Sequence, residues 1–312
     1  MRLKIFVKRT AWLLVLIFII INVVACFHAY KFTHFSTKDD AKTKSGEKLS
    51  LTDKITTLIF GISNPRPENN KLPSQPYETV NLQSNKQIEC WSIRHENAKG
   101  TVILFHSNGA QKSSLLEKSD EFLNLGYSTI LVDFMGSGGS EGNQTTIGFK
   151  EAAQVNTAYQ YAKERGDSNI YLFGSSLGAA AILKAVDEFQ LSPQGIIVEC
   201  PFGSLYTTTC ARFRSMGVPS FPMAGLLVFW GGVQNGFWAF SHNPIEYAKN
   251  INCPALLFYG ERDEKVSRKE IDEIYANLKG KRELVTFSLS GHDSYFPAYR
   301  EQWLQKVQEI LH

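Results

Sequence analysis

Residues 170–178 read IYLFGSSLG, a short apolar run that ends in the pattern GSSLG. An apolar run of this length is typical of a buried strand, and Ala179–Glu188 after it has the composition of a helix. A G-x-S-x-G pattern between a strand and a helix predicts a sharp turn that projects the central serine above a sheet. We therefore expect Ser176 to be a nucleophile, with Ser175 as a neighbour.

Apolar runs of the same kind recur on both sides of this turn. They show little alternation, as strands covered on both faces do. The candidates are Thr101–Phe105, Thr129–Asp133, Ile170–Phe173, Gly195–Glu199, Ala255–Tyr259 and Glu283–Phe287. Upstream, Tyr77–Leu82 and Gln87–Arg94 alternate and predict an antiparallel pair at the sheet edge.

Helical stretches separate the strand candidates. Ser113–Leu125 and Phe149–Arg165 each end at a glycine, which suits a helix C-terminus. Ser267 with Glu270 forms a capping box, and Tyr295–His312 closes the chain as an amphipathic helix. Alternating strands and helices require parallel crossovers. The sequence therefore predicts an α/β fold with a mostly parallel, doubly wound sheet.

A serine hydroxyl needs a base, and the ends of the last two predicted strands offer a base and an acid. His292 follows the last strand in SGHD, and Asp263 follows the penultimate strand in YGERD. A carboxylate there would hold the imidazole tautomer and stabilise its charged form. We expect Ser176, His292 and Asp263 to act together, with Glu261 and Glu199 as alternative acids.

The tetrahedral oxyanion of an acyl transfer needs backbone donors. One should be the N–H of Leu177, directly after the nucleophile. The other should come from the loop after Thr101–Phe105, which reads HSNG, and its position favours the N–H of Asn108. We expect His106 to shape this loop, in preference to a role as the base.

In this order, the motifs HSNG, DFMGSGGSEG, GSSLG, YGERD and SGHD resemble the α/β-hydrolase superfamily. The likeness covers roughly residues 77–312 and is nearest to the serine-aminopeptidase-like, monoacylglycerol-lipase-like and depalmitoylase-like branch. It implies the α/β-hydrolase fold and hydrolysis of an ester, thioester or amide through an acyl-enzyme, without metal or cofactor. Ser107 stands where the family usually has glycine, and Met135 where arginine is common.

The N-terminal segment combines a basic head with a long apolar run. Arg2, Lys4, Lys8 and Arg9 precede Ala11–Ala25, which predicts a signal peptide or a signal anchor. Either interpretation leaves the basic head in the cytoplasm and the catalytic domain outside it. We favour an uncleaved transmembrane anchor over residues 1–35. In the alternative, Val23-Val24-Ala25-Cys26 is a lipobox and Cys26 becomes lipidated.

Residues 36–70 are expected to form a spacer before a hydrolase domain at 71–312. The net charge of +3 comes from the basic head, because the remaining 29 basic residues face 30 acidic ones. This balance argues against nucleic-acid binding. The five cysteines form no CxxC motif and no cluster at metal spacing, so we expect unpaired thiols; a Cys200–Cys210 bridge is the alternative.

Residues 203–250 lie between two predicted strands, where the family inserts a cap. The stretch is rich in apolar side chains, among them Phe221, Phe229, Trp230, Trp238 and Phe240. Such density suits either an acyl-chain pocket or packing of the cap on the core. We expect a small-molecule or acylated substrate and hydrolysis of an ester or thioester. The alternatives are a serine aminopeptidase and a silent binding protein, which should lack a triad member.

Overall fold

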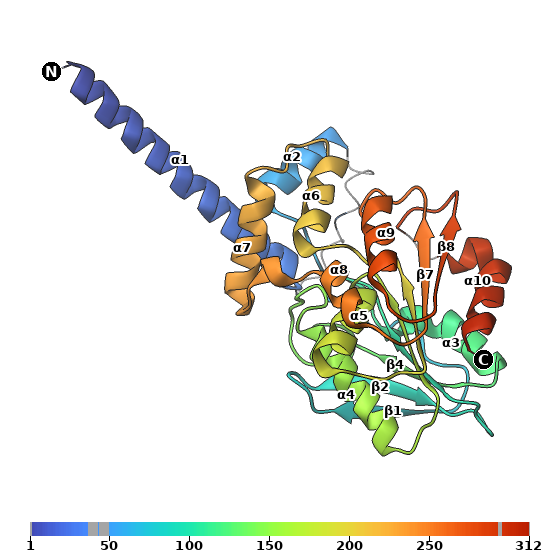
Figure 1. Cartoon of the computed structure of the whole chain (residues 1–312). Helices are drawn as coiled ribbons and strands as arrows, with labels where there is room; N and C mark the ends of the chain where they lie inside the picture. The colour runs from blue at the N-terminus through green and yellow to red at the C-terminus, as the bar shows by residue number, and fades with distance from the viewer. Residues whose placement is uncertain (1, 37–42, 44–49, 293–294, 312) are drawn as a thin grey trace.

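The structure is a computed structural model that describes residues 2–36, 43, 50–292 and 295–311. Within these residues, eight strands form one sheet in the order β1-β2-β4-β3-β5-β6-β7-β8 (Figure 1). The pairs β1/β2 and β2/β4 are antiparallel, and all other neighbours are parallel. The strands are β1 (Tyr77–Leu82), β2 (Ile88–Ile93), β3 (Thr101–Phe105), β4 (Ser128–Val132), β5 (Ile170–Ser175), β6 (Gly195–Glu199), β7 (Ala255–Gly260) and β8 (Arg282–Phe287).

Helices connect and cover the strands. The α-helices are α1 (Arg2–Thr33), α2 (Leu51–Phe60), α3 (Leu116–Asn124), α4 (Glu151–Glu164), α5 (Leu177–Phe189), α6 (Leu205–Ser215), α7 (Met223–Asn235), α8 (Pro244–Tyr247), α9 (Arg268–Asn277) and α10 (Phe296–Ile310). Short 3₁₀ helices are η2 (Lys112–Leu115), η3 (Ala239–Ser241) and η4 (Ala248–Asn250).

Two hydrophobic layers lie on opposite faces of the sheet. One layer contains buried residues of α4, α5 and α9, such as Val155, Ile182 and Ile271. The other contains residues of α3 and α10, such as Phe122 and Trp303. Since helices cover both faces, the predicted doubly wound, mostly parallel sheet is confirmed.

The expected elements match the observed ones closely. All eight strands begin and end within two residues of their predicted limits, and the antiparallel pair lies at the sheet edge. The predicted helix from Ser113 begins instead as the 3₁₀ turn η2, and the Ser267–Glu270 capping box is present. All five cysteines are free, so the alternative Cys200–Cys210 bridge is wrong.

The connection from β6 to β7 is helical over the expected cap, residues 203–250. Helices α6 and α7 leave the sheet, and α8 returns to pack against α5 and α9. In Figure 1, α6 and α7 lie on the side of the sheet from which α1 projects. We call residues 204–242 the cap segment.

Helix α1 is continuous and is long and apolar enough over Lys4–Thr33 to cross a membrane. Part of the expected spacer, residues 37–42 and 44–49, lies outside the described residues. The rest is structured, because it contains α2 with a Ser50–Asp53 capping box. Arg66 donates to the Gly138 carbonyl at 3.2 Å, and Asn69 donates to Asp133 at 2.7 Å. The second half of the spacer is therefore integrated into the folded domain.

Candidate active site

Ser176 stands alone between the end of β5 and the start of α5. Its backbone has φ 51° and ψ −105°, a sparsely populated conformation for a residue other than glycine. The glycines on both sides permit this turn. A Cβ on Gly174 would lie 2.6 Å from the carbonyl carbon of Gly178, and one on Gly178 would lie 2.5 Å from the Phe105 oxygen. The glycines of the GSSLG pattern thus permit the sharp turn at Ser176 and allow the start of α5 to pack closely on β3.

Three of the predicted site residues meet above the carboxyl ends of the strands. The Ser176 Oγ lies 2.9 Å from His292 Nε2, and His292 Nδ1 lies 2.7 Å from Asp263 Oδ2. An ionised carboxylate can only accept, so Nδ1 carries the ring proton and Nε2 is free to accept from the serine hydroxyl. The geometry therefore suits transfer of the Ser176 proton to His292.

Asp263 is held by the backbone around it. Its side chain is fully buried, and its Oδ1 accepts from the N–H groups of Lys265 at 2.8 Å and Val266 at 2.9 Å. The loop that carries it is tied to the histidine loop, because the Arg262 N–H donates to Ser290 O at 2.9 Å. The carboxylate thus has one oxygen fixed by the chain and the other directed at His292.

The environment of His292 stabilises the positive charge that the ring acquires when it accepts a proton. Burial opposes protonation of the ring, but the side chains of Cys200 and Asp263 outweigh this effect and raise the pKa of His292 above its usual value. A base with a raised pKa binds the serine proton more strongly in the transition state. Asp293, which follows in the SGHD motif, lies outside the described residues.

The loop expected to supply the second oxyanion donor lies beside the Ser176 turn. Strand β3 pairs with β5 so that Phe105 lies opposite Gly174. The backbone carbonyl groups of Phe105 and His106 pack against Gly178. Leu177 is the first residue of α5, where N–H groups have no partner within the helix. Asn108 lies in the adjoining loop. The roles of both N–H groups stay predictions.

His106 is engaged by the backbone and is not part of the serine–histidine–aspartate chain. Its Nε2 accepts from the Phe134 N–H at 3.0 Å, and its Nδ1 lies 2.8 Å from the Ser107 carbonyl, to which it donates. Burial lowers the pKa of His106, in keeping with a neutral ring that has one acceptor and one donor nitrogen. These contacts agree with the expected role in shaping the loop.

Neither alternative acid contacts His292. Glu261 is exposed at the surface. Glu199 is buried and accepts from Lys118 Nζ at 2.6 Å and Trp303 Nε1 at 2.9 Å, as well as from the Ser175 hydroxyl. Sequence reasoning did not identify Lys118 and Trp303 as supports of the turn, because their contacts with Glu199 link positions about 80 and 100 residues apart.

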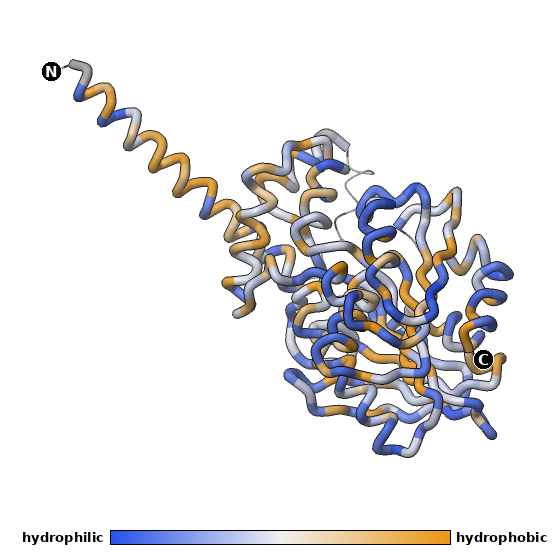
Figure 2. The backbone as a smooth tube through the Cα atoms, viewed as in Figure 1, coloured by the Kyte–Doolittle hydropathy of each residue, from blue (hydrophilic) through white to orange (hydrophobic). Residues whose placement is uncertain are grey.

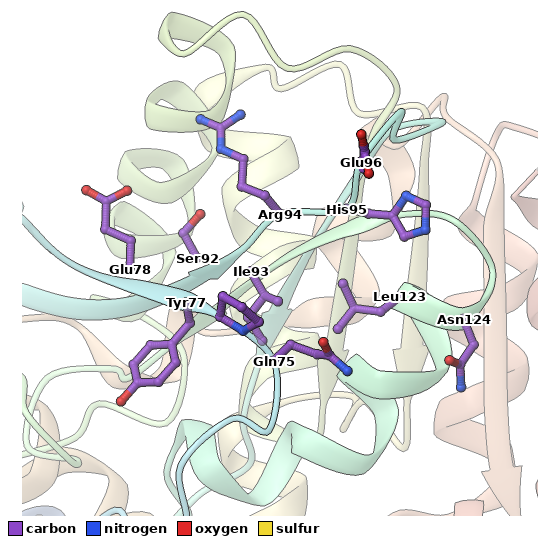
Figure 3. A pocket seen from close by; sticks show the side chains of 11 residues that line it. Gln75, Tyr77, Glu78, Ser92, Ile93, Arg94, His95, Glu96, Leu123 and Asn124 are labelled. Carbon is purple, nitrogen blue, oxygen red and sulfur yellow. The ribbon is translucent and has the colours of Figure 1, made fainter.

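A surface hollow lies away from Ser176. It has a volume of about 730 Å³ and is lined by residues of β1, β2 and the end of α3, including Tyr77, Arg94 and Asn124 (Figure 3). His95 in its wall donates from its N–H to the side chain of Ser128, at the start of β4. The hollow therefore lies at the amino ends of the parallel strands, opposite the edge that carries Ser176.

The chain is similar in sequence to known hydrolases and to a membrane protein. Residues 96–228 match the family model described as serine aminopeptidase S33. The chain is 24% identical over 250 residues to lysophosphatidylserine lipase ABHD12 of Danio rerio, covering 72% of this chain and 59% of that protein. It is 29% identical over 242 residues to the uncharacterized membrane protein YNL320W of Saccharomyces cerevisiae, covering 74% and 81% of the two chains.

A solved structure shares the fold. The esterase Pf2001 of Pyrococcus furiosus superposes with a TM-score of 0.65 at 23% identity, over 79% of this chain and 96% of that one.

Proposed function

We propose that this chain, which is a member of the α/β-hydrolase superfamily, is a serine hydrolase that cleaves carboxylic esters or thioesters. The observation that carries the proposal is the hydrogen-bonded chain from Ser176 Oγ through His292 to Asp263. The likeness to an esterase structure and to a lysophosphatidylserine lipase supports the ester class.

In the proposed reaction, Ser176 Oγ attacks the carbonyl carbon while its proton passes to His292 Nε2. The oxyanion that forms accepts hydrogen bonds from the N–H groups of Asn108 and Leu177. The imidazolium then protonates the leaving alcohol or thiol, and an acyl-enzyme remains. Water, deprotonated by His292, attacks this ester, releases the acid and restores the Ser176 hydroxyl.

Asp263 acts through His292 in this scheme. Its carboxylate keeps the proton on Nδ1 and stabilises the imidazolium formed in each half of the reaction. This contact is already present in the resting protein, where Asp263 Oδ2 lies 2.7 Å from His292 Nδ1.

We further propose that α1 is an uncleaved anchor with the hydrolase domain on the extracytoplasmic side. The basic residues Lys4, Lys8 and Arg9 at its start favour a cytoplasmic N-terminus. The yeast relative is named a membrane protein, which supports anchoring. Mass spectrometry of the mature N-terminus separates the two forms, because the lipoprotein alternative would begin at a lipidated Cys26.

Amide hydrolysis is the second candidate, since the matching family model is described as serine aminopeptidase. An aminopeptidase needs a carboxylate for the free amine of its substrate. Glu199 and Asp263 are already engaged by Lys118 and His292, which favours esters. A silent binding protein is the least favoured alternative, because serine, histidine and aspartate are all present and hydrogen-bonded.

A fluorophosphonate probe tests the enzyme class. We expect it to label the wild type and Ser175→Ala, but not Ser176→Ala. Labelling of Ser176→Ala would contradict Ser176 as the nucleophile. Failure to label any of the three proteins, the wild type included, would contradict it too. Initial rates on p-nitrophenyl esters of graded chain length, beside aminoacyl amides, then separate esterase from aminopeptidase activity. Faster turnover of the amides would favour the second candidate.

A further inference from the structure

Most of the cap segment belongs to an unusually long stretch without charge. Residues 215–245 hold no Asp, Glu, Lys or Arg, although 20% of the whole chain is charged. Helix α7 lies in the middle of this stretch, with the sequence MAGLLVFWGGVQN. A surface helix of a water-soluble domain normally carries a charged face. The composition of α7 is that of a helix in contact with lipid or with another apolar element.

Helix α7 packs along the last third of α1. The Trp230 indole N–H donates to Asn22 Oδ1 at 3.1 Å, and Gln234 donates to the Cys26 carbonyl at 2.8 Å. Small residues allow a close approach, because Ala25 and Ala29 of α1 are buried. Interhelical hydrogen bonds and small residues are the contacts that join helices within membranes.

The length of α1 determines the depth of this contact. At about 1.5 Å per residue its 32 residues extend about 48 Å, whereas a bilayer core of about 30 Å needs about 20 residues. Counted from Thr10, the first residue after the basic head, those residues end near Ala29. Asn22 and Cys26 then lie in the outer half of the bilayer. Helix α7, which is hydrogen-bonded to both, must lie at the same depth.

Apolar side chains are exposed beside this contact. Phe221 is 84% exposed and Val233 is 54% exposed, and Phe229 and Trp238 also face outward. The end of α2 adjoins α1, because Gly61 lies against Phe27 and Lys31, and α2 exposes Ile55, Leu58, Ile59 and Phe60. In Figure 1, α7 lies beside the end of α1 and α2 lies above α7, and Figure 2 shows hydrophobic residues on all three helices. The exposed apolar side chains of α2 and α7 thus belong to elements that contact α1.

Arg212 of α6, a partly buried side chain, gives this surface a basic margin. Its guanidinium lies 4.5 Å from the centre of the Phe32 ring, near the end of α1. Within the described part of the chain it makes no hydrogen bond or ion pair. A guanidinium has five donors, and a lipid phosphate at the membrane surface is an acceptor of matching charge and position.

We propose that α7 and the exposed face of α2 are embedded in the outer leaflet of the bilayer that holds α1, with Arg212 facing lipid phosphates. The inference rests on the proposed anchoring of α1 and is independent of the esterase activity. The cap segment is thus a second membrane-contacting element, and the hydrolase domain is held at the lipid surface in a fixed orientation. An apolar acyl substrate would reach the cap from the bilayer.

Lipid cross-linking of the full-length protein tests this. p-Benzoylphenylalanine is introduced in place of Phe18, Phe221, Val233 or Phe189, in vesicles of phosphatidylethanolamine and phosphatidylglycerol. Phe18 lies within the span, and Phe189 is a matched exposed phenylalanine at the end of α5. We expect lipid adducts by mass spectrometry at positions 18, 221 and 233, and background at 189.

Each other result has a distinct meaning. Adducts at position 18 alone leave the anchor intact and overturn the embedded cap. Cross-links between protein chains at 221 and 233, in place of lipid adducts, show that a second copy covers the surface and also overturn it. Absence of adducts at position 18 contradicts the anchoring of α1 itself.

The basic margin has a separate test. Phosphatidylglycerol, compared with phosphatidylcholine alone, should raise the adduct yield at Val233 by about fivefold, the effect of one cation at an anionic surface. We expect Arg212→Gln to lose this increase and Arg94→Gln, on the far edge of the sheet, to keep it. An equal increase in both variants contradicts the role of Arg212.

Discussion

The backbone carbonyl of Glu199 accepts a hydrogen bond of 2.8 Å from the N–H of Ser176, so the last residue of β6 holds the turn that carries the proposed nucleophile. The same residue binds Ser175 and Lys118 through its buried carboxylate. Main chain and side chain of one residue thus support both serines of the turn.

Replacing Glu199 by glutamine should destabilise the protein strongly. Lys118 would remain buried without its charged partner, and breaking a buried pair costs about 3–5 kcal/mol. Denaturant unfolding measures the loss. The double variant Glu199→Gln/Lys118→Met should recover part of it, and Glu261→Gln, at an exposed carboxylate, should change stability by less than about 0.5 kcal/mol. Equal losses in the single and double variants would rule out the ion pair as the cause.

Ser176→Ala and His292→Ala should each lower kcat by about 10⁴- to 10⁶-fold, because the two side chains act in one proton transfer. The double variant should be no slower than either single variant, which steady-state kinetics on a p-nitrophenyl ester measures. Multiplicative losses in the double variant would mean that the two residues act in separate steps.

Asp263→Asn should lower kcat by about 10⁴-fold, because an amide no longer fixes the proton on Nδ1. The wild-type kcat/KM should rise with pH as His292 loses its proton, and the midpoint should lie above 6.5 because the pKa of His292 is raised. In Asp263→Asn the midpoint should move to lower pH. A pH–rate profile decides, and an unchanged midpoint would exclude Asp263 as a source of the raised pKa.

Two helical glycines should respond in opposite ways to alanine. Gly178→Ala places a Cβ about 2.5 Å from the Phe105 oxygen and should destabilise the protein by about 1–3 kcal/mol and reduce activity. Gly225→Ala in α7 meets no atom closer than 4.0 Å and should be stabilising by up to about 1 kcal/mol. Thermal unfolding and ester hydrolysis measure both. Equal changes in stability and activity in the two variants would show that close packing on β3 is not the reason for glycine at position 178.

His242 should make stability depend on pH. Its ring is fully buried, its Nε2 lies 2.9 Å from the Ile147 carbonyl, and burial lowers its pKa to about 4. The unfolded chain takes up a proton near pH 6.5 and the folded chain does not, so stability is complete above pH 6.5 and declines as pH falls towards 4. The loss should reach about 3 kcal/mol. Urea unfolding at each pH measures it, and His242→Gln should be less sensitive. Equal pH dependence in both proteins would assign the effect to other groups.

Local sequence patterns predicted the sheet and selected Ser176, Asp263 and His292 as residues that would lie together. They could do so because buried strands, glycine turns and capping boxes have short-range signals. The contact between α1 and α7 has no short-range sequence signal. Asn22 reads in the sequence as a polar interruption of a membrane span, and only the fold shows that Trp230, 208 positions later, is its partner. Helix α2 was missed because its capping box lies within a polar stretch that resembles a linker.

The close approach of the aspartate and histidine loops matters for protein engineering. A Cβ on Gly260 would lie 2.3 Å from the Gly291 carbonyl, and the Glu261 N–H donates to Phe287 O at 3.0 Å, so the two loops fit each other as a matched pair. A loop graft that aims to change substrate preference should therefore transplant residues 260–266 and 287–292 together as one cassette. Exchange of either loop alone would misalign the Asp263 carboxylate and the His292 ring in the chimera.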